Sequence, residues 1–168
     1  MPSIYDYGLW PLVLINIALF GGFILTFLRP VNRREWRSLG LFLAFIVALF
    51  TEMYGLPLTI FLLAVALGRL PFANPFVHSS GNLWASLLLG QAWAGWMMGL
   101  GSMIMLVSFI LLEKGWRLIH AAQDEPVTSG IYGVIRHPQY VGLILLVIGA
   151  LIQWPTLITL LMAPILIA

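Results

Sequence analysis

Arg136 and His137 stand side by side at the start of a long uncharged stretch, in the sequence SGIYGVIRHPQYVG at positions 129–142. Proline is favoured in the first turn of a helix, because its φ angle is fixed and it has no N–H group to leave unpaired. We therefore expect a helix to begin at Pro138, with His137 at or near its cap. The free N–H groups and positive dipole end of that helix, together with the two basic side chains, would suit a carboxylate or a phosphate.

Aromatic and glycine residues surround this basic pair. The rings of Tyr132 and Tyr140 could stack on a flat heterocycle or lie against a cation. Three glycines would let the backbone approach a ligand closely: Gly130, Gly133 and Gly142. S-adenosylmethionine combines a carboxylate, an adenine ring and a sulfonium cation, and it is therefore the small molecule that we expect this pattern to bind.

The same residues have a simpler interpretation. Arg136 and His137 could be an ordinary anchor that reaches the membrane surface ahead of a span, with the two tyrosines as interfacial residues. Taken alone, the basic pair and Pro138 would favour that interpretation. The full spaced pattern from Gly130 to Gly142 favours the ligand site.

The composition indicates the environment of these residues. Hydrophobic residues make up 61% of the 168 residues and charged residues 8%, with a mean hydropathy of +1.02. Since a soluble domain has about a quarter of its residues charged, we expect an all-α polytopic membrane protein with one domain, residues 1–168. Cysteine is absent, which excludes disulfides, thiolate metal sites and cysteine nucleophiles.

Five apolar stretches are expected to form the membrane helices. A helix needs roughly 20 residues to cross a bilayer, and the length of each stretch is compared with this number. The stretches are residues 9–28, 39–68, 93–112, 138–153 and 156–168. The second is long enough to span with a kink, which Pro57 would supply. The fifth is too short to span, and Thr156 is expected to cap its N-terminus.

Basic residues are divided unevenly between the loops, and this predicts the orientation of the chain. By the positive-inside rule the N-terminus lies outside, and the loop that carries the motif faces the cytoplasm. We expect the membrane to be a bacterial or archaeal cytoplasmic membrane. Arg69 lies on the outer side, whereas the expected cytoplasmic residues are Arg29, Arg33, Arg34, Arg37, Lys114, Arg117 and Arg136.

Small and polar residues elsewhere have more modest interpretations. Gly95, Gly99 and Gly101 are expected to be helix-contact positions, where small residues let two backbones approach. His120 and Asp124 are spaced i and i+4, but a solvated helix face explains them better than a metal site. We therefore expect no bound metal. The expected partners are membrane lipids and not nucleic acid.

Glu52 lies near the middle of the second apolar stretch, where an ionisable side chain is costly. One interpretation is a functional residue that lines a polar cavity. The other is a protonated or paired glutamate that contacts Asn16 or Tyr54 for packing. A transporter that uses Glu52 is a weaker hypothesis, since five spans without an inverted repeat argue against it.

The motif residues resemble a known family. The pattern GxYxxxRHPxYxG, from Gly130 to Gly142, is similar to that of the membrane methyltransferases typified by isoprenylcysteine carboxyl methyltransferase, which share it with phospholipid methyltransferases. The similarity covers about residues 113–168. It implies a cofactor pocket for S-adenosylmethionine on the cytoplasmic side and a lipophilic acceptor that enters from the bilayer.

By this resemblance the motif residues take roles in the pocket. Arg136 is the candidate catalytic residue, which would either orient an anionic acceptor or hold the cofactor carboxylate. The implied cofactor-binding residues are Gly130, Tyr132, Arg136, His137, Pro138, Tyr140 and Gly142.

The sequence also departs from the family pattern. Family members continue into a cytoplasmic segment with a Glu-Glu pair that closes the pocket, and no such pair occurs before Ala168. We expect either a fragment of a longer enzyme or a shortened relative. The alternative function is a non-catalytic or accessory subunit that associates with other membrane subunits.

Overall fold

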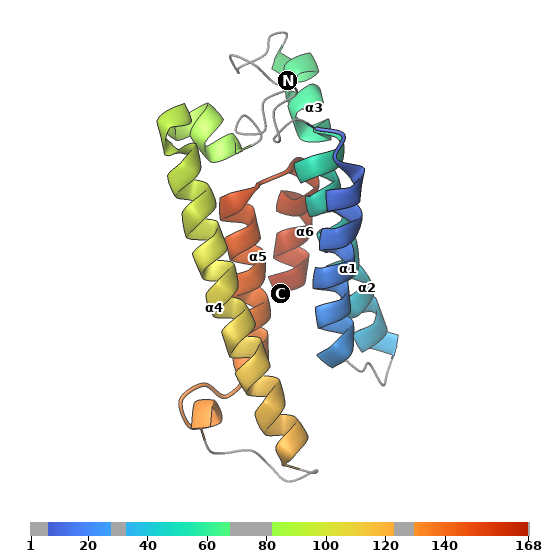
Figure 1. The fold of residues 1–168 in the computed structure, drawn as a ribbon, viewed down its shortest axis with the longest axis vertical. Coiled ribbons are helices and arrows are strands. Elements are labelled where there is room, and N and C mark those ends of the chain that lie inside the picture. The colour runs from blue at the N-terminus through green and yellow to red at the C-terminus, as the bar shows by residue number, and fades with distance from the viewer. Residues whose placement is uncertain (1–6, 28–32, 68–81, 123–129, 168) are drawn as a thin grey trace.

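A computed structural model describes residues 7–27, 33–67, 82–122 and 130–167 of the chain. The regular structure within these ranges is helical, as Figure 1 shows, and the all-α prediction is confirmed for them. Three predicted positions, Arg29, Arg69 and Asp124, lie outside the described residues. The α-helices are α1 Trp10–Phe27, α2 Arg33–Phe50, α3 Leu58–Leu67, α4 Ala94–Ala121, α5 Pro138–Gln153 and α6 Leu157–Ile167.

The long helix α4 lies along α5, and this antiparallel pair is the most extensive helix contact in the fold (Figure 1). Small residues allow the two backbones to approach. A Cβ atom added at Gly101 would lie 2.6 Å from the carbonyl oxygen of Gly149, and one at Gly142 would lie 2.7 Å from Cγ of Leu112. The hydroxyl of Ser108 donates to the carbonyl of Gly142 at 2.7 Å and joins the helices further.

The helix-contact prediction for the glycines of α4 is thus confirmed at only one position. Gly101 is buried against α5, whereas Gly95 and Gly99 are exposed, and among the described residues no other part of the fold comes within 4 Å of a Cβ atom added at either position. For these two residues the prediction is wrong as far as the described residues are concerned. The helix turns through about 100° per residue, so residues 95 and 99 share a face that points away from α5.

The second apolar stretch is broken, as Pro57 predicts. Helix α2 continues as a π-helical turn, η1 (Thr51–Gly55), and the chain then bends by 75° before α3 begins at Leu58. Proline has no N–H group with which to continue the helix. The end of η1 is instead held by the N-terminal segment, because Gly8 N–H donates to the carbonyl of Gly55 and Leu9 N–H to that of Tyr54, both at 2.9 Å.

Side chains also hold the turn between α5 and α6. Asn82 Nδ2 donates to the carbonyl of Gln153 at 2.9 Å, and Trp84 Nε1 donates to that of Leu151 at 2.8 Å, so two carbonyls of the last turn of α5 are satisfied. Thr156 caps α6 as expected, with its Oγ1 accepting the N–H of Thr159 at 3.1 Å. These bonds fix the end of α5 that is remote from the motif.

Phenylalanine and aliphatic side chains from α1, α2, α4 and α5 fill the interior of the bundle. Phe20 of α1 contacts Phe50 and Phe109 edge to face, at ring-centroid distances of 4.8 and 5.3 Å. Such edge-to-face pairs add to the stabilisation from burial. Residues of α2 and α5 complete this core, namely Phe42, Phe45, Ile46, Leu49, Leu146, Val147 and Ala150.

One described helix, α4, is long and apolar enough by itself to cross a bilayer. The stretch Leu39–Gly55 passes the same test only together with α3, across the 75° bend, whereas α1, α5 and α6 are apolar but shorter. Helix α4 also runs to Ala121, beyond the predicted end of its span at residue 112. There Glu113 and Arg117 form an i, i+4 ion pair of 3.1 Å, which suits a helix that leaves the apolar region.

Candidate functional site

The motif begins with a short 3₁₀ turn, η5 (Gly130–Gly133), which is followed by the N-terminus of α5. Gly130 has a φ angle of +63°, in the left-handed region that favours glycine. A Cβ atom at this position would also approach Leu118 of α4 to 3.1 Å. Gly130 is therefore required by the turn itself, as well as by its closeness to α4.

Helix α5 begins at Pro138 with His137 as its cap residue, as the sequence predicts. The N–H groups of Tyr140 and Val141 both donate to the carbonyl of His137, at 3.1 and 3.2 Å. The imidazole of His137 makes no capping hydrogen bond to the helix. It stays available at the positive end of α5, where an anion is favoured.

Tyr132 fastens the 3₁₀ turn to both long helices. Its hydroxyl donates to Oε1 of Gln139 at 3.0 Å and lies 3.4 Å from the carbonyl oxygen of Gly115 on α4. Burial raises the pKa of the Tyr132 phenol, so the hydroxyl keeps its proton and its role as a donor. Pro138 is buried beside Gly115, at 3.5 Å from an added Cβ atom.

Arg136, His137 and Tyr140 form the outer part of the motif, and all three are exposed. Tyr140 is 60% exposed, and the centroid of its ring lies 5.5 Å from that of His137 at an interplanar angle of 53°. A guanidinium, an imidazole and a phenol ring are thus displayed together at one helix N-terminus. We call this set the Arg136 cluster.

The predicted cofactor residues accordingly fall into two groups. The three residues of the Arg136 cluster are presented at the surface. Four others turn inward or shape the backbone: Gly130, Tyr132, Pro138 and Gly142. Gly142 in particular lies in the α4–α5 interface, where its close approach is to Leu112.

Glu52 lies at the opposite end of α5 from the Arg136 cluster. The cavity that Glu52 lines also includes Trp154, Pro155 and Thr156, which directly follow α5. From Pro138 to Gln153, α5 rises by about 22 Å at 1.5 Å per residue. Glu52 therefore does not contribute to the motif site.

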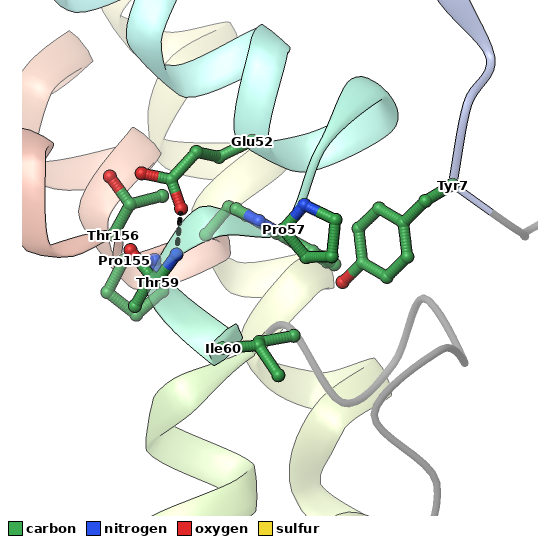
Figure 2. A pocket seen from close by; sticks show the side chains of 8 residues that line it. Tyr7, Glu52, Pro57, Thr59, Ile60, Pro155 and Thr156 are labelled. Carbon is green, nitrogen blue, oxygen red and sulfur yellow. Dashed lines mark hydrogen bonds between the residues drawn. The ribbon is translucent and has the colours of Figure 1, made fainter. Parts of the chain in front are cut away.

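The local contacts of Glu52 are shown in Figure 2. The side chain is 4% exposed, and Oε2 accepts the N–H of Thr59 at 2.8 Å in the first turn of α3. A carboxylate is favoured at a helix N-terminus. Oε1 is buried and has no hydrogen-bond partner among the described residues. The cavity beside it has a volume of about 10 Å³, close to the space that one water molecule needs.

Groups from α3, α6 and the N-terminal segment lie next to Glu52. Thr59 also accepts the N–H of Leu157 through its Oγ1, at 2.9 Å, so the N-termini of α3 and α6 meet beside the carboxylate. Tyr7 lines the same cavity, and its pKa is raised by burial and by the charge of Glu52. Asn16, one of the expected partners of Glu52, donates instead to the carbonyl of Leu12 at 2.8 Å.

Two residues at the ends of α5 were missed by sequence reasoning. Gln139 is the hydrogen-bond partner of Tyr132, and Gln153 has a buried Oε1 atom without a partner among the described residues. Gln139 occupies an unspecified position of the motif pattern, and Gln153 marked only the end of an apolar stretch. Their contacts depend on how α4, η5 and α5 pack, which no local pattern encodes.

A comparison with protein families bears directly on the motif. Residues 89–168 match the family described as phospholipid methyltransferase. The matched range includes α4, η5, α5 and α6, and with them the whole pattern from Gly130 to Gly142. The resemblance to this group of methyltransferases is thereby confirmed. No curated protein and no solved structure matches the chain.

Proposed function

We propose, from the phospholipid methyltransferase family match of residues 89–168, that this protein transfers a methyl group from S-adenosylmethionine to a lipophilic acceptor at the cytoplasmic face of a membrane. The observation that carries the proposal is the exposed Arg136 cluster at the N-terminus of α5. A methyltransferase match and a site suited to a carboxylate and an aromatic ring coincide at the same residues.

Each residue of the Arg136 cluster has a specific role in the proposal. Arg136 and the N-terminus of α5 hold the cofactor carboxylate, because a guanidinium forms paired, charge-assisted hydrogen bonds with such a group. The rings of Tyr140 and His137 lie 5.5 Å apart and offer faces to the adenine or the sulfonium. Tyr132 does not contact the ligand in this proposal, since its hydroxyl is engaged by Gln139.

The reaction asks little of these residues as acids or bases. S-adenosylmethionine supplies an activated methyl group: the sulfur–methyl bond breaks as the acceptor's electron pair forms the new bond, and S-adenosylhomocysteine leaves. In-line alignment and exclusion of water provide most of the acceleration in such a transfer. The protein's part is therefore to fix the cofactor by the Arg136 cluster, so that the acceptor meets it at the membrane surface.

The surface of the helices supports a membrane location. Large apolar side chains point away from the bundle on α1, α3, α4 and α6, including Leu14, Leu19, Val65, Met103, Leu106 and Leu161. In water such a surface would be an aggregation hazard, whereas lipid accommodates it. We propose the five-span topology with the N-terminus outside. The described basic side chains of Lys114, Arg117 and Arg136 support it, since they follow the apolar part of α4 or precede α5.

The proposal is tested by methyl transfer in native membranes. Membranes that contain the full chain are incubated with S-adenosylmethionine labelled in its methyl group, and the lipid extract is then counted. We expect label in the lipid fraction with the wild type and at least a tenfold lower rate with His137→Ala. The matched control is His120→Ala, which removes another exposed histidine near the end of α4. Equal rates in membranes with and without the protein would refute catalysis and favour the accessory-subunit alternative.

A further inference from the structure

A second cavity, of about 100 Å³, lies inside the bundle at the end of α5 that is remote from the Arg136 cluster. Residues of α1, α2, η1, α4 and α5 contribute to its wall. The wall is mostly apolar and includes Phe20, Leu49, Phe50, Met53, Met105 and Ala150. It differs in this respect from the much smaller cavity beside Glu52.

Two amides also line this cavity, and one has an unused acceptor. Oε1 of Gln153 is buried and has no hydrogen-bond donor among the described residues. Nδ2 of Asn16 carries two hydrogens and directs one of them to the carbonyl of Leu12, at 2.8 Å. A buried acceptor without a donor is unfavourable. A ligand that donates one O–H group to this oxygen would therefore bind more tightly than a ligand of the same size without a donor.

Water alone would fill this cavity poorly. By the measure that gives the cavity beside Glu52 room for one water molecule, a cavity of 100 Å³ holds several, and each buried water makes about three hydrogen bonds. The described side chains of the wall offer one unused acceptor, on Gln153, and one further amide hydrogen, on Asn16, while the rest of the wall is mainly rings, methionine and aliphatic side chains. A purely apolar molecule would match the wall but would leave Oε1 of Gln153 without a donor.

We infer that this cavity binds a small aliphatic alcohol group, which donates its hydroxyl hydrogen to Oε1 of Gln153 and places its carbon chain against the rings of Phe20 and Phe50. The volume is smaller than that of the roughly 150 Å³ cavity known to hold benzene. The enclosed part of the ligand is therefore about four or five non-hydrogen atoms.

This site is distinct from the proposed methyl-transfer site. Gln153 ends α5, and Pro138 beside the Arg136 cluster begins it, about 22 Å away along the helix. A molecule held at Gln153 would not present its hydroxyl to the cofactor. The inference consequently does not depend on whether the protein is a methyltransferase.

The first test uses the wild-type chain alone, in detergent or lipid discs. A butanol that carries a photoreactive diazirine is crosslinked to the protein, and the labelled peptides are identified by mass spectrometry. We expect saturable labelling on segments that include Phe20, Phe50 and Met105, competed by excess 1-butanol. The analogue with fluorine in place of the hydroxyl has the same number of non-hydrogen atoms but no donor, and we expect its labelling of these segments to be at least about fivefold weaker. Equal labelling by the alcohol and the fluoro analogue would overturn the inference.

The second test removes the acceptor. In Gln153→Leu the side chain keeps a similar size but has no oxygen, and we expect the alcohol to lose its advantage over the fluoro analogue. The matched control is Gln139→Leu, which makes the same change at the other end of α5 and should label like the wild type in the cavity segments. Unchanged alcohol preference in a folded Gln153→Leu variant contradicts the inference. The wild-type comparison decides the question if that variant does not fold.

Discussion

The hydroxyl of Tyr132 lies 3.0 Å from Oε1 of Gln139 and joins the turn before α5 to the first turn of that helix. The same hydroxyl lies 3.4 Å from the carbonyl of Gly115, so the contact reaches α4 as well. The phenol has one proton, which it donates to Oε1 of Gln139, and the longer contact with the Gly115 carbonyl places the same hydroxyl against α4. This contact sets the position of the intervening residues, among them Arg136 and His137.

We therefore expect Tyr132→Phe to weaken ligand binding without removing a ligand contact. Loss of the hydroxyl should lower the free energy of unfolding by about 1 kcal/mol and reduce the affinity for S-adenosylhomocysteine severalfold. Gln139→Leu should have a similar effect. Because both changes break one contact, the double variant should be little worse than either single variant. Calorimetric titration of all four proteins measures this coupling, and fully additive losses would disprove the shared role.

The close approach of α4 and α5 makes Gly101 intolerant of a side chain. A Cβ atom there would lie 2.5 Å from Cβ of Gln153 and 2.6 Å from the backbone oxygen of Gly149, which cannot move independently. We expect Gly101→Ala to lower stability by about 1–3 kcal/mol, as overpacking does. Gly99→Ala is the control on the same helix, with open space around it, and its higher helix propensity should leave stability unchanged or slightly raised. Thermal unfolding in detergent compares the two, and equal melting temperatures would contradict the observed packing.

Glu52 should matter for stability and not for cofactor binding. Glu52→Gln keeps an oxygen that can accept the N–H of Thr59, so we expect a loss below about 1 kcal/mol. Glu52→Leu leaves that N–H buried without an acceptor, which costs about 1–3 kcal/mol. Both variants should bind S-adenosylhomocysteine like the wild type, because the carboxyl group lies at the other end of α5. Loss of binding by a stable Glu52→Gln variant would require a different location for the site.

The proposed orientation can be measured by cysteine labelling, since the chain contains no cysteine and has no background. Trp93 precedes α4 and is 51% exposed, whereas Lys114 follows its apolar part and is also exposed. A membrane-impermeant maleimide applied to intact cells should label Trp93→Cys and spare Lys114→Cys until the cells are opened. The reverse labelling pattern would place the Arg136 cluster on the outer face, where it could not bind S-adenosylmethionine from the cytoplasm.

The helices themselves were largely predictable from sequence. The apolar stretches at 9–28, 138–153 and 156–168 correspond closely to α1, α5 and α6, because apolar residues run without a break between polar or proline-containing ends. Pro57 correctly predicted the break before α3, and Pro138 correctly predicted the start of α5. Both predictions hold because the missing N–H of proline affects only the adjacent backbone. The number of membrane spans stays a prediction.

The site was predictable in part. Its basic pair and rings could be recognised from residue types, but the sequence did not separate exposed residues such as Tyr140 from inward ones such as Tyr132. That division depends on how η5 packs against α4. The buried oxygens of Glu52 and Gln153 that have no hydrogen-bond partner among the described residues were equally hidden, because a missing donor is a property of the whole arrangement of neighbours.

Calorimetric titration of S-adenosylhomocysteine into the purified full chain tests the cofactor site most directly. We expect saturable one-to-one binding by the wild type and by His120→Ala, and at least tenfold weaker binding by His137→Ala with an unchanged melting temperature. Absence of binding by the folded wild type, or equal binding by His137→Ala, would contradict a cofactor site at the N-terminus of α5.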